Sequence, residues 1–166
     1  HINYNVDKEV RNMITLARVD ERLIHGQVAY AWTMVYPSDA IIVVDQEAEK
    51  DALQRSLLEM ACPRTMKCFI ANESKSVEIL KKYPKKKFFL VAKHPQSFLT
   101  IMKQGIEMKN INIGGIYFKE GRKQITNTVF LDQKSMDILK ELHERGVYLD
   151  GRTTPSDNEL DLFTKL

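Results

Sequence analysis

Short apolar runs alternate with longer amphipathic segments along most of this chain. The apolar runs, rich in Val, Ile and Phe, lie at residues 14–19, 40–44, 66–71, 88–92 and 111–113. Between them, apolar residues recur every three or four positions, as at Val28, Ala31 and Trp32. The first pattern is typical of buried strands, and the second of helices that cover a sheet. The alternation predicts an α/β fold with a mainly parallel central sheet and helices on both faces.

The predicted helices end at residues that a helix cannot easily pass. Proline or glycine follows the helices expected at 25–36, 53–61, 77–83 and 95–104. The apolar positions that mark the helix at 53–61 are Leu53, Leu57 and Met60. Beyond residue 113 we expect loops, an extra strand within 126–131, a helix at 132–145 and a strand at 147–149. Thr154–Pro155 predicts the start of a final helix, because proline suits the first helical position.

Length and composition narrow the class of protein. The chain has 166 residues, 43% of them hydrophobic and 28% charged, which suits one globular domain and excludes fibrous and disordered classes. The formal charge of +3 is too small to indicate nucleic-acid binding by itself. No apolar run approaches the roughly 20 residues of a membrane-spanning helix. Cys62 and Cys68 lack zinc-site spacing, so we expect reduced thiols and no metal site.

The first twelve residues differ from the rest. Residues 1–12 are mostly polar and show no periodicity, so we interpret them as a leader ahead of a native start at Met13. The single domain then spans residues 13–166. No signal peptide follows Met13, and we therefore expect a cytoplasmic protein.

The densest group of reactive side chains follows the first predicted strand. Arg18, Asp20, Arg22 and His25 fall within eight consecutive positions near the carboxyl end of that strand. In parallel α/β sheets, ligands bind at this end of the strands. Arginine guanidinium groups match the oxygens of a phosphate group. This part of the chain is therefore the first candidate for an active site.

The start of the following helix adds to this candidate site. Gly26 lets the backbone approach a ligand closely, and Gly26 and Gln27 supply unpaired amides of the first helical turn. Such a helix terminus attracts phosphate. His25, at the junction of loop and helix, is a candidate nucleophile that could carry a phosphoryl group, which the arginines would stabilise. Asp20 could orient either His25 or Arg22. The same residue types also fit a surface or helix-capping histidine beside a solvated arginine face.

A second histidine competes with His25. His94 and Lys93 follow the strand at 88–92, on the same side of the predicted sheet. His94 has no flanking arginines, so a loop histidine that lines the site or a partner surface is the favoured interpretation. Gly114–Gly115 most simply permits a tight turn after the strand at 111–113.

The motif Arg18-x-Asp20-x-Arg22-x-x-His25-Gly26-Gln27 resembles the active-site signature of one enzyme family. That family is the mannose/fructose/sorbose enzyme IIB of the bacterial phosphoenolpyruvate-dependent sugar phosphotransferase system. The resemblance covers residues 13–166. Supporting matches lie at residues 41–45, 50–60, 112–115 and 118–123.

The resemblance implies a concrete activity. Such proteins accept a phosphoryl group from a phosphohistidine on enzyme IIA, hold it on the histidine that matches His25, and pass it to a sugar bound by the membrane subunits IIC and IID. It also implies a parallel sheet covered by helices, no cofactor, and association with the membrane only through the transporter complex. With twelve residues ahead of Met13, we expect a standalone IIB subunit. The chain could also form a homo-oligomer, and the sugar stays open.

Two other classes of function are kept as alternatives. A receiver-like signalling domain is also a doubly wound α/β protein, and Asp20–Glu21 resembles its acidic pair. That class needs an aspartate after the third strand, where this chain has Ala71-Asn72-Glu73-Ser74. A non-catalytic module that binds nucleic acid through the lysines at 81–87 is the other alternative. The modest net charge of the chain and the lack of interleaved aromatic residues count against this second alternative.

Overall fold

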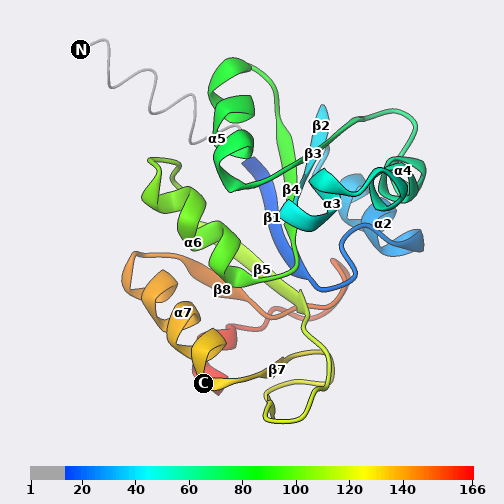
Figure 1. Ribbon diagram of the computed structural model, residues 1–166. Helices are drawn as coiled ribbons and strands as arrows, with labels where there is room; N and C mark the ends of the chain where they lie inside the picture. Colours follow the sequence, from blue (N-terminus) through cyan, green and yellow to red (C-terminus); the bar gives the residue numbers. More distant parts are fainter. Residues whose placement is uncertain (1–13) are drawn as a thin grey trace.

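Six strands form one parallel sheet in the order β3-β2-β4-β1-β5-β8 (Figure 1). The computed structural model describes residues 14–166, so the predicted leader and the start at Met13 lie outside the described residues. The strands are β1 (Ile14–Asp20), β2 (Ala40–Val44), β3 (Lys67–Ala71), β4 (Phe88–Ala92), β5 (Asn110–Gly115) and β8 (Tyr148–Asp150). Every neighbouring pair is parallel, which confirms the predicted fold class.

Helices cover both faces of this sheet. They are α2 (Gly26–Val35), α3 (Gln46–Lys50), α4 (Ala52–Ala61), α5 (Glu73–Lys82), α6 (Pro95–Lys103) and α7 (Gln133–Glu144). One face packs against α5, α6 and α7, and the other against α2, α3 and α4. Along β4, Phe88 and Leu90 join the first core whereas Phe89 and Val91 join the second. This alternation explains why the strand is apolar at every position.

The strand order makes the end of β1 a natural ligand site. β1 lies between β4 and β5. From β1 the chain crosses through α2 to β2 on one side, whereas β5 and β8 extend the sheet on the other side. Loops that leave neighbouring strands in opposite directions open a crevice at their carboxyl ends. The loop at residues 21–25 stands at this crevice.

The helix predicted at 53–61 forms as α4, but its apolar residues face outward. Leu53, Leu57 and Met60 are 71%, 58% and 82% exposed, whereas Leu58 is buried. The short helix α3, which the sequence pattern did not reveal, precedes α4 and packs against both α4 and β3. Helix α4 thus turns only one side, with Leu58, toward the core.

The prediction that a final helix begins at Thr154–Pro155 is wrong. The carboxylate of Asp157 accepts hydrogen bonds of 3.0 Å from the backbone N–H groups of residues 153 and 154, which closes a turn there. Asp161 then forms an antiparallel bridge with Asp150 at the end of β8. Only a four-residue 3-10 helix, η1 (Leu162–Lys165), follows.

The segment between β5 and α7 forms a small two-stranded ribbon. Its strands are β6 (Lys123–Gln124) and β7 (Phe130–Leu131), and they pair in antiparallel fashion. The extra strand predicted within 126–131 is therefore present as β7. None of the helices within residues 14–166 has the length and apolar character that crossing a membrane requires.

Candidate functional site

Arg18 and Asp20 are both buried at the carboxyl end of β1. Arg18 is 2% exposed and Asp20 is 0% exposed. Arg18 Nη2 donates a hydrogen bond of 3.1 Å to Asp20 Oδ2, and its Nη1 donates one of 2.6 Å to Asn112 Oδ1 on β5. Burial lowers the pKa of Arg18 from its ordinary value, although Asp20 acts in the opposite direction. Arg18 is thus engaged inside the protein and does not present its guanidinium group at the surface.

Asp20 connects the members of the predicted motif. Its Oδ1 accepts a hydrogen bond of 2.9 Å from the backbone N–H of Arg22 and lies 3.6 Å from Arg22 Nε. Its Oδ2 lies 3.9 Å from His25 Nδ1. The sequence left open whether Asp20 orients His25 or Arg22, and the geometry places its carboxylate beside both side chains.

The loop between β1 and α2 holds His25 at the helix start. Leu23 has a φ of 58°, unusual for a residue with a side chain, and Gly26 has a φ of 48°. Leu23 and Ile24 are buried, which anchors the loop to the core. His25 occupies the N-cap position of α2, and its side chain does not cap the helix. The imidazole is therefore not committed to a capping role, which answers one alternative reading of this histidine.

The imidazole of His25 is partly enclosed. Its side chain is 24% exposed. Nδ1 lies 3.4 Å from the carbonyl oxygen of Leu23, and Nε2 is buried without a hydrogen-bond partner among residues 14–166. The ring thus stands at the N-terminus of a ten-residue helix, beside one carboxylate and with one nitrogen unsatisfied.

Arg22 is the accessible cation of the motif. Its side chain is 50% exposed, and its guanidinium carbon lies 4.7 Å from the ring centroid of Tyr117. This cation–π contact restrains the guanidinium group, while half of the side chain stays accessible to a ligand. The two arginines of the motif therefore differ in exposure, since Arg18 is buried beside Asp20 and Arg22 is half exposed.

Gly114 and Gly115 do not form the predicted turn. Both belong to β5, and neither has a positive φ. A Cβ atom at Gly114 would overlap the guanidinium group of Arg18. A Cβ atom at Gly115 would lie 2.6 Å from the hydroxyl oxygen of Tyr117 and 2.9 Å from Asp20 Oδ1. The glycines are needed because buried functional side chains pass directly over the β5 backbone.

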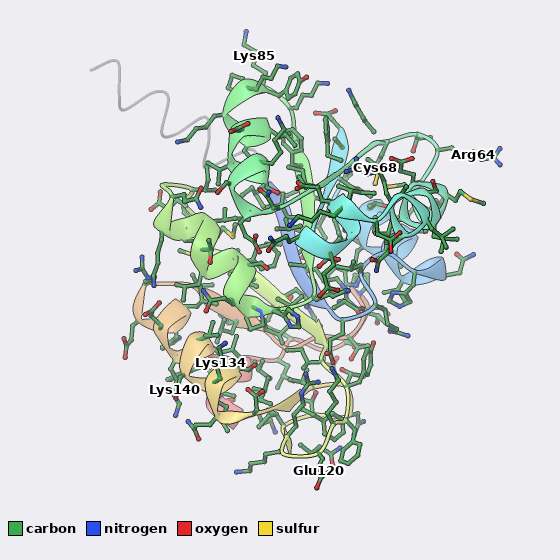
Figure 2. The ribbon with its side chains drawn as sticks, in the orientation of Figure 1. Arg64, Cys68, Lys85, Glu120, Lys134 and Lys140 are labelled. Atoms are coloured by element: carbon green, nitrogen blue, oxygen red, sulfur yellow. The ribbon has the colours of Figure 1, made fainter. Side chains whose placement is uncertain are left out.

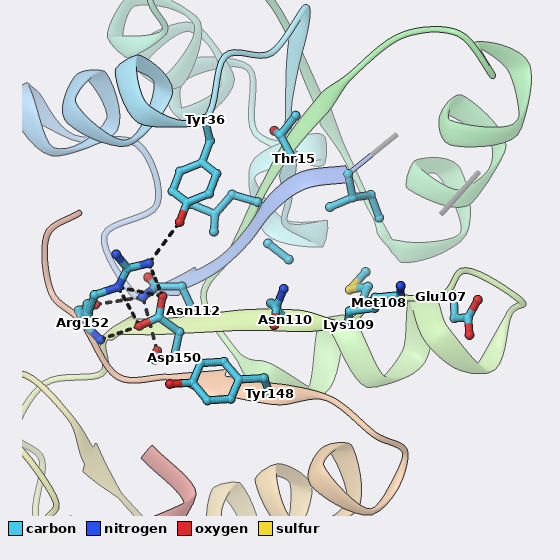
Figure 3. Close-up of a pocket in the computed structure, with 13 residues that line it drawn as sticks. Thr15, Tyr36, Glu107, Met108, Lys109, Asn110, Asn112, Tyr148, Asp150 and Arg152 are labelled. Carbon is cyan, nitrogen blue, oxygen red and sulfur yellow. Dashed lines mark hydrogen bonds and ion pairs between the residues drawn. The ribbon is translucent and has the colours of Figure 1, made fainter. Parts of the chain in front are cut away.

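A second set of contacts joins Asn112, Asp150, Arg152 and Tyr36 (Figure 3), and Asn112 is also the residue that binds Arg18. Asn112 Nδ2 donates to the carbonyl oxygen of Arg152 at 2.8 Å. Arg152 pairs with Asp150 at 2.7 Å and donates to the hydroxyl of Tyr36 at 3.1 Å. The hydrogen bonds to Asp150 raise the pKa of Arg152. The guanidinium carbons of Arg18 and Arg152 lie 5.2 and 5.3 Å from the ring centroid of the buried Trp32.

Glu21 links the segment after β5 to the loop between β1 and α2. It accepts a hydrogen bond of 2.6 Å from the backbone N–H of Tyr117 and one of 2.8 Å from Arg122 Nη1. Burial acts to raise the pKa of Glu21, but the bonds from Arg122 and Tyr117 and the nearby Lys119 hold it below its ordinary value. Tyr117, Glu21 and Arg122 were not singled out as site residues from the sequence. Glu21 lies within the motif at 18–27 and was considered only as part of an acidic pair, whereas Tyr117 and Arg122 lie beside or within the supporting match at 118–123.

His94 and Lys93 lie in a separate hollow beside the site. The hollow has a volume of about 610 Å³, and its lining includes both residues together with Tyr117 and Glu21, but not His25. Lys93 Nζ lies 3.5 Å from Asp45 Oδ2. Gly26 and Gln27 border another hollow, of about 300 Å³, on the other side of the loop. The structure thus joins Arg18, Asp20, Arg22 and His25 in one network and places His94 and Lys93 next to it.

The lysine-rich run lies far from this network. Lys85 lies at the end of the molecule opposite Glu120, which belongs to the segment after β5 (Figure 2). Among residues 14–166, no group of three or more His, Cys, Asp or Glu side chains could hold a metal ion.

Comparison with known proteins gives one consistent result. The family described as PTS system sorbose subfamily IIB component matches residues 14–166. The chain is 39% identical over 156 residues to the sorbose-specific EIIB component of Lacticaseibacillus casei, covering 93% of this chain and 95% of that protein. It is 32% identical over 159 residues to the mannose-specific EIIAB component of Escherichia coli (strain K12), covering 93% of this chain and 49% of that protein. The crystal structure of the IIBSor domain of the sorbose permease from Klebsiella pneumoniae matches with a TM-score of 0.89 at 35% identity, covering 92% of this chain and 95% of that one.

Proposed function

This chain belongs to the sorbose subfamily of IIB components of the sugar phosphotransferase system, and on that premise we propose that His25 carries the phosphoryl group. In this proposal His25 receives the group from a phosphohistidine on enzyme IIA. It then passes the group to a sugar bound by the membrane subunits IIC and IID. Family membership replaces the receiver-like domain and the nucleic-acid module as interpretations of the fold.

The observation that carries the proposal is the position of His25. Its imidazole stands at the N-terminus of α2, 3.9 Å from a fully buried carboxylate that also binds the backbone of Arg22. A ring nitrogen attacks the phosphorus atom, the new N–P bond forms, and the N–P bond to the donor histidine breaks. The donor leaves as a neutral imidazole, because its other ring nitrogen keeps the proton that it carried in the phosphohistidine. Asp20 stabilises the positive charge that the phosphorylated ring of His25 acquires.

The charge of Arg22 and the N-terminus of α2 stabilise the phosphoryl group during transfer. Arg22 is half exposed and can reach the phosphoryl oxygens while its guanidinium group stays stacked on Tyr117. The first-turn amides of α2, beginning with Gly26 and Gln27, add partial positive charge at the same place. Phosphoryl transfer depends chiefly on such positioning and charge stabilisation. Arg18 acts as a positioning residue in this scheme, because it holds Asp20 from the interior.

The surfaces beside His25 suit two successive partners. His94 and Lys93 line the hollow on one side of the loop, and Gly26 and Gln27 border the hollow on the other. We assign His94 and Lys93 to contact with a partner rather than to the chemistry, since His25 does not line their hollow. Enzyme IIA and the IIC and IID subunits would meet this surface in turn. In the second encounter the chain would lie at the cytoplasmic face of the membrane.

Uptake of a phosphoryl group from phosphorylated enzyme IIA tests the proposal. Mass spectrometry at neutral pH, which preserves acid-labile phosphohistidine, should show one phosphate that maps to His25. The phosphate should be absent in His25→Ala. It should still map to His25 in His94→Ala, although uptake should be slower there because His94 is assigned to partner contact. Phosphate that maps to His94 would move the chemistry away from His25. Lack of uptake from several enzyme IIA donors would overturn the carrier role.

A further inference from the structure

Two buried polar atoms at the site lack a hydrogen-bond partner. Within residues 14–166, three buried side-chain nitrogen or oxygen atoms have none, and two of them are His25 Nε2 and the hydroxyl oxygen of Tyr117. Buried polar groups are nearly always satisfied in folded proteins, so each exception needs a reason. A ligand that arrives during function is one such reason, and both atoms belong to the region where the phosphoryl group is proposed to bind.

Tyr117 is held firmly in place by groups around it. Its backbone N–H donates a hydrogen bond of 2.6 Å to Glu21, and its ring lies 4.7 Å from the guanidinium carbon of Arg22. A Cβ atom built on Gly115 would lie 2.6 Å from the hydroxyl oxygen of Tyr117 and 2.9 Å from Asp20 Oδ1. The phenol oxygen and the catalytic carboxylate therefore converge over the same point of the β5 backbone.

The surroundings keep this hydroxyl protonated. Burial raises the pKa of Tyr117 from its ordinary value, and the charge of Asp20 raises it further, whereas Arg22 and Arg18 act in the opposite direction. A protonated phenol can donate one hydrogen bond. The site thus contains a donor hydroxyl that has no hydrogen-bond partner among residues 14–166.

We propose that Tyr117 is a further residue of the phosphoryl site, with two separable roles. Its ring holds the guanidinium group of Arg22 in place, and its hydroxyl donates a hydrogen bond to an oxygen of the phosphoryl group on His25. This inference rests on the proposed function, because the acceptor is the phosphoryl group that His25 carries. The phosphorylated protein thereby gains a hydrogen bond for a hydroxyl that is unpartnered within residues 14–166.

Two substitutions separate the roles. Tyr117→Phe keeps the ring under Arg22 and removes only the hydroxyl, and Tyr117→Leu removes both. Tyr148→Phe is the matched control, because the hydroxyl of Tyr148 bonds to Glu159 at an exposed position. Each variant is phosphorylated by phosphorylated enzyme IIA in a single turnover. The melting temperature of each is then measured with and without phosphate on His25.

A catalytic hydroxyl and a merely structural one predict different results. Tyr117→Phe should melt no lower than the wild type when unphosphorylated, since it loses only an unsatisfied group. Its transfer should be about tenfold slower, as expected for loss of one hydrogen bond to a charged group. It should also lose part of the rise in melting temperature that phosphorylation produces in the wild type. Tyr117→Leu should be slower still, and Tyr148→Phe should match the wild type.

The opposite results would overturn the inference in a recognisable way. Wild-type transfer and an undiminished thermal shift in Tyr117→Phe would remove the hydroxyl from the site. Equal rates in Tyr117→Phe and Tyr117→Leu would remove the role of the ring. A wild-type protein that takes up no phosphate at His25 would overturn the proposed function itself, and this inference with it.

Discussion

His25 Nδ1 and Asp20 Oδ2 lie 3.9 Å apart, which places a partly enclosed imidazole beside a carboxylate with no exposed surface. Asp20 is in turn bound by the buried Arg18 and by the backbone N–H of Arg22. The imidazole therefore faces a fixed negative charge whose own position is determined from the interior. The predictions below follow from this arrangement.

Asp20→Asn should weaken both folding and transfer. The substitution leaves the charge of Arg18 uncompensated in the interior, and breaking a buried ion pair in this way costs about 3–5 kcal/mol. Single-turnover transfer should also fall, because the phosphorylated imidazole loses its counter-charge. Urea unfolding and transfer rates would measure the two effects. Asp137→Asn, on the exposed face of α7, is the control, and equal stability of the two variants would contradict the buried pair.

Arg18 and Arg22 should respond differently to substitution. Arg22→Gln should fold with nearly wild-type stability, because the side chain is half exposed, and transfer should fall about 10²-fold through lost charge stabilisation. Arg18→Lys should lose stability, since an ammonium group cannot reproduce the forked hydrogen bonds to Asp20 and Asn112. Denaturant unfolding beside single-turnover kinetics would separate the two. The reverse pattern would show that the two roles are exchanged.

Gly114→Ala should destabilise the fold although β5 has ordinary backbone angles there. The new methyl group would overlap the guanidinium group of Arg18, and overpacking of this kind costs about 1–3 kcal/mol. In an Arg18→Met background the same change should cost less, because the obstructing group is gone. A double-mutant cycle of unfolding free energies measures the coupling. Strict additivity would argue that some other contact makes glycine necessary.

Glu21 should contribute stability that depends on pH. Its pKa is held below the ordinary value of 4.5 in the folded protein, mainly by Arg122 and by the N–H of Tyr117 against the effect of burial. The contribution is therefore fully present above pH 4.5 and is lost as the pH falls through the lower, folded-state value. The difference in unfolding free energy between the wild type and Glu21→Gln should shrink from pH 6 to pH 3. A difference that stays constant over this range would rule out the pairing as its source.

Much of the fold followed from local patterns in the chain. The five main apolar runs became β1 to β5, and the motif from Arg18 to Gln27 was found at the carboxyl end of the first of them. The errors arose where side chains compete with backbone periodicity. Asp157 closes a turn in place of the final helix, and α4 buries Leu58 while Leu53, Leu57 and Met60 face outward.

The sequence alone determined the fold class and the chemical character of the loop that carries His25, because periodicity and residue type are local properties. Only the tertiary structure decided which of the two arginines is buried and which is exposed. Arg18 meets Asn112 across 94 residues of chain, and Arg22 stacks on Tyr117, which Glu21 holds from the neighbouring loop. Such contacts depend on β1 and β5 being neighbours. The order of strands in a sheet is set by packing of the whole chain, which no local pattern encodes.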